Sequence, residues 1–357
     1  MLYKPDWETV QKRYIEYWAC ENHDSPILHI TAPRDKEISM PQKQFQTIAD
    51  RWFDVEYMLE RADIGFQNTY FGGDAFPCLN PNLGPDLFAA LYGVPLEFGN
   101  DTSWSLHNLS DWTEYKPFKI DRGNFYYKKI LEMTEAAVEN GKDKYLVGIT
   151  DIHAGLDGLA AFRGPDTLCI DALEHPEFLK KGAMDLFEGF KTLYGDLAEI
   201  TGRYQKGTSN WMGIWHPGRW YVTSCDFICL ISCEMFEDLV VEELQAELAY
   251  LDASIFHLDG PGALRHLDRL LEIKELKGIQ WVYGAGQPGA AHWLPVLQKI
   301  QAAGKAFQIH TSAEDIPVLL ENLAPEGAMY MTGARNEAEA RDIEALAAGA
   351  YGRKNSW

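Results

Sequence analysis

The sequence predicts an α/β fold: a (β/α)₈ TIM barrel with an N-terminal helix, formed by residues 1–357 as a single domain. Short apolar runs, each followed by turn residues, alternate with amphipathic segments of helical periodicity. This alternation favours a parallel sheet, because each parallel connection needs a crossover that is usually a helix. An open doubly wound sheet would have a glycine-rich first turn, whereas Ala32–Asp35 contains no glycine. Eight such runs therefore favour a closed barrel.

The predicted strands are apolar, β-branched or aromatic runs. They lie at Pro26–Ala32, Ile64–Phe71, Tyr145–Thr150, Asn210–Trp215, Ser254–Leu258, Ile279–Tyr283, Ala306–Ile309 and Met329–Met331. The segment Gly72–Lys144 is too long for one crossover, so we expect an insertion between strands 2 and 3 that covers the barrel mouth. A helix at Trp7–Glu21 is expected to cap the bottom of the barrel. Ser232 is a typical N-cap for a helix that continues to Tyr250.

Composition and charge exclude several classes of partner. The chain is 46% hydrophobic and carries a net charge of −21, from 53 acidic and 32 basic residues. Such a surface repels nucleic acid and anionic membranes and disfavours a polyanionic substrate. No apolar stretch is long enough to span a bilayer, and the charged N-terminus lacks a signal-peptide core. We therefore expect a cytoplasmic protein, and its acidity and aromatic content are compatible with a homodimer.

The six cysteines do not form a typical metal or disulfide pattern. There is no CxxC pair, and in a cytoplasmic enzyme we expect reduced, buried side chains. Cys225, Cys229 and Cys233 are four residues apart, which would place them on one face of a helix. Packing is therefore the favoured interpretation of this run.

Residues at or just past the predicted strand ends are the candidate active-site residues, because the catalytic groups of a barrel come from the carboxyl ends of its strands. These residues are Arg34, Phe71, Asp74, Asp151, His153, Trp215, His216, His257, Asp259, Tyr283, His310 and Thr332. For His153, His216 and His310 alone, a hydrogen-bonded structural role is the more common alternative.

His257 and Asp259 form the strongest pair among these candidates. Alternation along a strand places both side chains on one face, with Leu258 on the other. A histidine and a carboxylate in this arrangement form an acid/base pair or two ligands of a divalent metal ion. The structural alternative is that they cap the helix that starts at Pro261.

Aromatic residues near three predicted strand ends indicate a second feature of the site. They are Tyr70, Phe71, Trp211, Trp215, Trp281 and Tyr283. Together they predict walls of a substrate pocket for a flat, apolar or cationic group, with Asp74 and Asp226 as counter-charges. For any single one of them, a place in the barrel core is the default.

Several motifs resemble the uroporphyrinogen decarboxylase-like superfamily, which has a (β/α)₈ barrel fold. Tyr221–Phe227 and Leu230–Phe236 resemble the aspartate loop and the "ISPEMF" helix start of that superfamily. His257–Gly260 falls at its "HxCG" strand end. Phe71–Asp74 resembles its "FSD" turn, and Arg163–Leu168 its "GGPxTL" segment. The order of these motifs, from about Pro26 onward, identifies the chain as a divergent member.

The resemblance implies two chemistries. The decarboxylases act without a cofactor on a porphyrinogen with many carboxylates, through arginines near the first strand and the "FSD" aspartate. Here Asp74 matches that aspartate, but only Arg34 remains of the arginine motif. The methyltransferases move methyl groups between corrinoid proteins and small molecules, and their thiol-activating members bind zinc through one histidine and two cysteines. Here His257 matches, but Asp259 and Thr332 stand at or near the cysteine positions.

A corrinoid, if used, is expected on a separate partner protein. Asp151–Gly155 is similar to the cobalamin-binding DxHxxG loop, but its glycine is one place too early and the downstream glycine-rich segments are missing.

The favoured function is therefore a methyltransferase or demethylase subunit that acts on a small methylated substrate together with a corrinoid protein. His257, Asp259, Asp74 and Asp226 are its predicted catalytic residues, and zinc on His257 and Asp259 is its candidate cofactor. The substrate-binding candidates are Arg34, Tyr70, Phe71, His153, Trp215, His216, Trp281, Tyr283 and His310. A cofactor-free decarboxylase or lyase, with Arg34 gripping a carboxylate, and a non-catalytic ligand-binding barrel are the alternatives.

Overall fold

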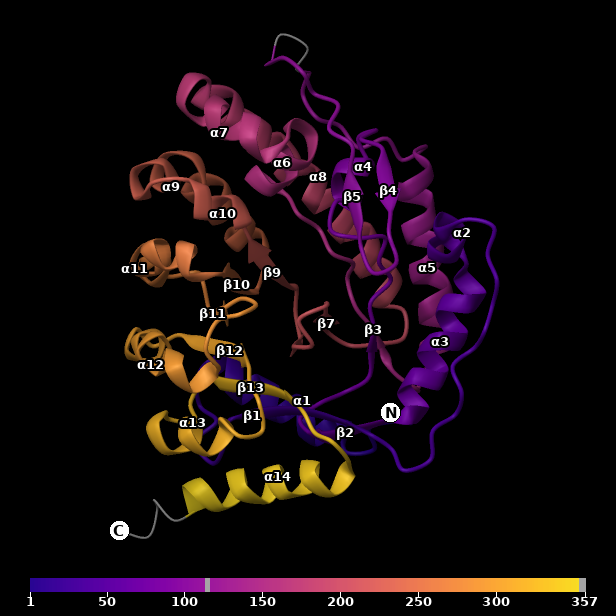
Figure 1. The fold of residues 1–357 in the computed structure, drawn as a ribbon, viewed down its shortest axis with the longest axis vertical. Coiled ribbons are helices and arrows are strands. Elements are labelled where there is room, and N and C mark those ends of the chain that lie inside the picture. Colours follow the sequence, from indigo (N-terminus) through magenta and orange to yellow (C-terminus); the bar gives the residue numbers. More distant parts are fainter. Residues whose placement is uncertain (113–115, 353–357) are drawn as a thin grey trace.

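The computed structural model describes residues 1–112 and 116–352 as a curved, mostly parallel sheet with helices on its outer face (Figure 1). The strands are β1 (Ile27–Pro33), β2 (Thr69–Gly73), β3 (Cys78–Leu79), β4 (Leu96–Phe98), β5 (Ser103–Ser105), β6 (Leu146–Val147), β7 (Thr208–Ser209), β8 (Trp215–His216), β9 (Trp220–Ser224), β10 (Ala253–Asp259), β11 (Gly278–Val282), β12 (Ala306–His310) and β13 (Ala328–Gly333).

The helices alternate with these strands. They are α1 (Trp7–Ala19), α2 (Ile48–Phe53), α3 (Val55–Asn68), α4 (Leu87–Ala90), α5 (Phe125–Gly141), α6 (Gly155–Arg163), α7 (Pro165–Glu174), α8 (Pro176–Thr201), α9 (Cys233–Leu239), α10 (Val241–Tyr250), α11 (Leu267–Glu272), α12 (Leu294–Ala302), α13 (Ile316–Asn322) and α14 (Glu337–Gly352). The 3₁₀ helices among the described residues include η2 (Asp226–Leu230), η3 (Pro261–His266) and η4 (Ala290–Trp293). As predicted, the Ser232 side chain caps α9, accepting from the Met235 N–H.

Seven strands form the central sheet in the order β2-β1-β13-β12-β11-β10-β9. Every neighbouring pair is parallel except β1 and β2, which are antiparallel. Helices α10 to α14 follow one another along the left and lower rim in Figure 1; among them, α12 packs against β11 and β12, and α14 against β1 and β2. The predicted strands at Pro26–Ala32 and from Ser254 onward coincide with this sheet.

The remaining strands are short. In Figure 1, β3 and β7 lie between the two edges of the sheet, β9 and β2, whereas the β4–β5 hairpin lies beside α4. β3 pairs with β6 in parallel, and one parallel bridge joins Ile149 to Asn210 next to β7. Within residues 1–112 and 116–352, no backbone ladder connects these strands to β9 or β2. The structure is thus a mixed α/β fold with a seven-stranded sheet, and it does not show the closed ring that the sequence predicts.

Two predicted strands are wrong. The residues of Ile64–Phe71 are helical to Asn68, and β2, which begins at Thr69, runs antiparallel to β1. The residues of Asn210–Trp215 turn back through Gly213, whose φ of 69° suits glycine, and β8 then pairs antiparallel with β7. The parallel strand of this region is β9, which the sequence analysis does not identify as a strand.

Helix α1 covers the end of the sheet where the strands begin, as predicted. The Tyr17 hydroxyl donates to the carbonyl of Phe307 at the start of β12 (3.2 Å), and the Trp18 indole donates to the Trp215 carbonyl (2.9 Å). The predicted insertion contains α4, the β4–β5 hairpin and α5. Of these, α5 is the crossover helix between β3 and β6 and packs against α8.

The cysteine run does not lie on one helical face. Cys225 precedes η2, Cys229 lies within it and Cys233 begins α9, because the chain changes direction at Ile231 and Ser232. All six cysteines are free thiols. In the part of the chain that the structure describes, no helix is both long enough and apolar enough to cross a membrane.

Candidate functional site

The candidate site lies at the carboxyl ends of β9, β10 and β11. Asp226 is the first residue of η2, directly after β9, and His257 and Asp259 alternate along the end of β10. In the sheet register, His257 is opposite Gln280 of β11. Parallel strands bring their carboxyl ends to one edge, so residues distant in sequence meet there.

Asp226, His257 and Asp259 form a three-residue group that we call the triad. One possible ligand atom from each lies within 4.8 Å of the others, and the Nε2 of His257 is 4.0 Å from an Oδ atom of Asp226. The Asp226 side chain is 55% exposed and that of His257 is 17% exposed. The group is therefore open on the Asp226 side.

The imidazole of His257 is held by a side chain from the neighbouring strand. The amide oxygen of Gln280, a residue that is 1% exposed, pairs with Nδ1 of His257. Because an amide oxygen only accepts, Nδ1 donates in this contact, and Nε2 is the ring nitrogen turned toward Asp226. The ring of Trp211 packs edge-on against the same imidazole, with centroids 5.4 Å apart.

Further charged groups surround the triad. The Asp151 carboxylate lies 3.0 Å from Nε2 of His153. Burial alone would lower the pKa of His153, but Asp151, Asp157 and Asp226 together raise it to about 10, so this side chain is an imidazolium at neutral pH. Burial and the charge of Asp226 raise the pKa of Asp259. One imidazolium among four carboxylates leaves an excess of negative charge that a divalent cation would balance.

The donor set fits such a cation. One imidazole nitrogen and two carboxylate oxygens suit zinc and harder divalent metals, and three protein ligands leave a position for substrate. No thiolate belongs to the group, because the Cys229 thiol donates instead to the backbone carbonyl of Asp259 (3.3 Å).

Asp74, predicted to be catalytic, lies at the opposite end of the sheet. Its carboxylate accepts from Arg13 of α1 (2.6 Å) and from the N–H of Leu28 at the start of β1 (2.9 Å). The prediction assumed that every strand runs in the same direction. Because β2 is antiparallel to β1, the residue that follows β2 emerges where the other strands begin.

Arg34 and Tyr70, both predicted to bind substrate, face α14 rather than the triad. The Arg34 guanidinium donates to the Thr69 carbonyl (3.1 Å) and to Glu337 (3.2 Å), and the Tyr70 hydroxyl contacts Glu344 (3.2 Å). Helix α14 therefore covers this side of β2.

Trp215 and His216 lie beside α1, at the end where the strands begin. The Trp215 ring packs edge-on against Trp7 and the His216 ring against Trp18. Burial lowers the pKa of His216, and its Nδ1 accepts from the Gly218 N–H (3.0 Å). Their predicted place at the barrel mouth is wrong, because β8 runs away from the mouth.

Trp281 is part of the packed outer layer. Its neighbour Gln280 faces inward to His257, so Trp281 faces outward, where it is completely buried against Trp293 (5.1 Å between rings). Tyr283 follows the end of β11, and burial and then Asp315 raise its pKa. The prediction that Trp281 lines the pocket is therefore wrong.

His310 and Phe71 lie on the inner side of the sheet. Gln308 is the register partner of Gln280, so His310, two residues further on β12, shares the face of His257. Burial and then the charge of His257 lower the pKa of His310. Phe71 lines an open cleft of about 750 Å³ at the carboxyl ends of β1 and β13.

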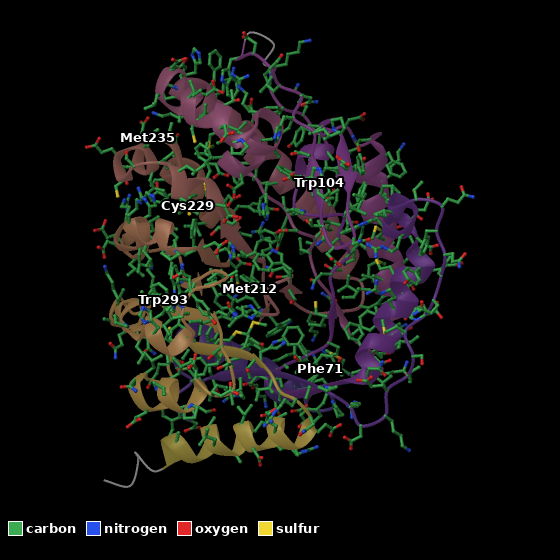
Figure 2. All side chains as sticks on the ribbon, viewed as in Figure 1. Phe71, Trp104, Met212, Cys229, Met235 and Trp293 are labelled. Carbon is green, nitrogen blue, oxygen red and sulfur yellow. The ribbon has the colours of Figure 1, made fainter. Side chains whose placement is uncertain are left out.

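This cleft has a mostly apolar lining, and Glu37 is its single charged residue among those described. Among its lining residues are Thr31, Phe66, Phe71, Leu79 and Gly333. An apolar pocket is predicted from the sequence, but of the six aromatic residues predicted to line it, Phe71 is the one that lines this cleft. Figure 2 labels Phe71, which lies on the edge strand β2, and Trp293, which lies in η4 between β11 and β12.

Sequence reasoning missed Gln280 and Asp157 as site residues. Gln280 is a polar residue within the apolar run Ile279–Tyr283, and that interruption is a readable signal. Asp157 accepts hydrogen bonds from the N–H groups of Asp226 (2.8 Å) and Phe227 (3.0 Å). No local pattern indicates a contact over such a sequence separation.

The comparisons with known proteins show a likeness to solved structures. Protein-family models and curated proteins gave no match to this chain. A methyltransferase from Methanosarcina mazei is similar in structure, with a TM-score of 0.61 and 12% sequence identity, over 97% of this chain and 99% of that one. At this identity the likeness shows a shared fold.

Proposed function

We propose that the chain is a methyltransferase-type enzyme whose triad holds a divalent metal ion through Nε2 of His257 and one carboxylate oxygen each of Asp226 and Asp259. The observation that carries this proposal is the convergence of the three ligand atoms within 4.8 Å, around an imidazole that Gln280 orients. The similar fold of the Methanosarcina mazei methyltransferase supports the class of reaction.

The ligand set favours oxygen- or nitrogen-bound methyl groups over thiols as partners of the metal. Carboxylate and imidazole donors are harder than thiolates, and no cysteine occupies the positions of Asp259 and Thr332. Thr332 offers only a neutral hydroxyl, which donates to the carbonyl of Gly333 (3.3 Å). When bound, a divalent cation polarises the donor atom of a substrate at its open position.

The protein's own residues then bind and orient the substrate. The apolar cleft beside Phe71 would take the body of a small methylated molecule, and it offers no lysine or arginine to an acid. His153, as an imidazolium, offsets part of the negative charge around Asp226. Trp211 shields one side of His257 from water.

We further propose a corrinoid on a separate protein as the other methyl carrier, docked at the carboxyl edge of the sheet. The fold would be a divergent (β/α)₈ barrel of the uroporphyrinogen decarboxylase-like superfamily, with zinc as the resident metal. Its eight parallel strands would be β1, β3, β6 and β9 to β13.

The decarboxylase alternative loses the two side chains on which it depended. Arg34 is engaged by Glu337 on the outer side, and Asp74 lies at the far end of the sheet. No described observation favours this chemistry over methyl transfer.

The test combines metal analysis with a methylation assay. Elemental analysis should find about one divalent metal per purified chain, lost in His257→Ala and retained in His216→Ala, a control histidine beside α1. Spectroscopy should show methylation of added cob(I)alamin by O- or N-methyl compounds, and the same variant should abolish it. A metal-free, inactive native protein would instead support the ligand-binding alternative.

A further inference from the structure

The segment that carries Asp226 spans the break in the sheet. β9 has a ladder partner, β10, on one side, and within residues 1–112 and 116–352 it has no strand ladder on the other. On this side β7 contacts β9, and α6 contacts η2. Asp226 therefore follows a strand, β9, whose backbone is paired with the rest of the sheet on one side, through β10.

Side chains bridge the break in place of a ladder. At the start of β9, the Trp220 N–H donates to the Thr208 hydroxyl of β7 (3.0 Å). The Tyr221 hydroxyl of β9 accepts from the N–H of Ile152 (2.6 Å) and donates to the carbonyl of Thr150 (2.9 Å). Further along, the carboxylate of Asp157 receives the N–H groups of Asp226 and Phe227, with one oxygen for each (2.8 and 3.0 Å). These N–H groups are the first two of η2 and have no partner within that helix.

Asp157 is well suited to this contact. It lies in the first turn of α6, where the positive end of the helix favours a carboxylate. Both of its oxygens are used by the two N–H groups, and it is not a member of the triad.

We propose that Asp157 is a positioning residue for the metal site: by anchoring the first turn of η2 to α6, it fixes the Asp226 carboxylate opposite His257. This inference rests on the proposed metal site. The Asp226 side chain is 55% exposed, and its one described side-chain partner is His257 at 4.0 Å. Without the anchor, its carboxylate would sample positions outside the triad.

The proposal predicts a graded loss of metal affinity. Residues that hold a metal ligand in place typically contribute about ten- to a hundredfold to the affinity for the metal. Asp157→Ala removes both acceptors and should weaken Mn²⁺ or Zn²⁺ binding by about that range. Asp157→Asn keeps one acceptor oxygen and should fall between Asp157→Ala and the native chain. An effect through charge alone would make the two variants equal.

The experiment measures Mn²⁺ and Zn²⁺ binding by equilibrium dialysis with the full chain, for the native protein and both variants. Ser232→Ala, which removes the N-cap of the adjacent α9, is the matched control and should bind as the native chain does. Hydrogen exchange of the Asp226 and Phe227 amides provides a second readout. It should be at least about tenfold faster in Asp157→Asn even if Asp157→Ala fails to fold.

The outcomes separate this inference from the proposed function. A native chain that binds neither ion overturns the proposed metal site and the inference with it. Metal binding by the native chain with unchanged affinity in Asp157→Asn and Asp157→Ala overturns the inference alone. Equal losses in the two variants, or an equal loss in Ser232→Ala, also overturn it.

Discussion

Nδ1 of His257 faces the amide oxygen of Gln280, its register partner on the neighbouring strand. The pairing joins β10 to β11 through side chains as well as backbone. It also determines which imidazole nitrogen is available to a metal ion, because the other one is occupied as a donor.

Gln280→Leu should therefore weaken metal binding by about ten- to a hundredfold with little loss of fold. The reason is that leucine fills a similar volume but cannot hold the imidazole in its tautomer. Equilibrium dialysis against Zn²⁺ checks the affinity, and circular dichroism checks the fold. Unchanged affinity would mean that Gln280 does not orient His257.

Gln308→Leu is the matched control and carries a prediction of its own. Gln308 is the register partner of Gln280 on β12 and is completely buried, and neither of its amide atoms has a hydrogen-bond partner among the described residues. A buried amide without partners costs about 1–3 kcal/mol. Denaturant unfolding should show a more stable variant, with metal affinity unchanged. A less stable variant would indicate an ordered water at this amide.

Asp74→Ala should destabilise the protein without affecting the metal site. Removing this carboxylate, which is 5% exposed, takes away the anionic partner of Arg13 and the acceptor of the Leu28 N–H. Breaking a buried ion pair costs about 3 kcal/mol or more. Urea unfolding measures the loss, and dialysis should find native affinity for Zn²⁺. Reduced affinity in the folded variant would contradict the placement of Asp74 away from the triad.

Gly333→Phe should block the cleft beside Phe71. A Cβ added at Gly333 meets no atom within 4 Å, so the backbone tolerates the change and the ring enters the cleft. Transfer of methyl groups should fall at least about tenfold while metal binding persists, because the cleft is closed to substrate. Gly349→Phe, at a similarly open site on α14, should retain full activity. Equal activity of the two variants would exclude the cleft as the substrate site.

Stability should fall with rising pH because of a buried carboxyl pair. Burial raises the pKa of Glu243, as does Glu247, and burial also raises the pKa of Glu247. Above the ordinary glutamate pKa, the unfolded chain has released these protons while the folded chain still binds them. The free energy of unfolding therefore declines with rising pH, by up to about 1.4 kcal/mol per pH unit for each proton.

Glu247→Gln tests this expectation. Its stability relative to the native chain should increase between pH 5 and pH 8, because the variant has no proton to lose at that position. Urea unfolding at several pH values measures the difference. A pH-independent difference would show that the pair is ionised in the folded protein.

The sequence predicts part of this arrangement well, because some features depend on local periodicity. The strands from Ser254 onward are short apolar runs with clear turns, and the two-residue period puts His257 and Asp259 on one face. Neither inference needs knowledge of distant residues.

The failures depend on relations between strands. Asp74 was misplaced because the direction of β2 follows from its pairing with β1, which no local pattern records. Trp281 looks like a pocket residue until the register with β10 places Gln280 inward. The contact of Asp157 with Asp226 joins residues of two separate crossover units.

The break in the sheet has a consequence for how such a site can be modified. A ligand on a strand inside a ladder moves only if several backbone hydrogen bonds move with it. Asp226 lies past the end of the β9 ladder, and hydrogen bonds of the Tyr221 and Asp157 side chains link this part of the chain to its neighbours. Substitutions at Tyr221 or Asp157 would therefore change the distances between the ligands of the proposed metal site. The preference among cations of different radius would change with them, while the hydrogen bonds of the sheet would be kept.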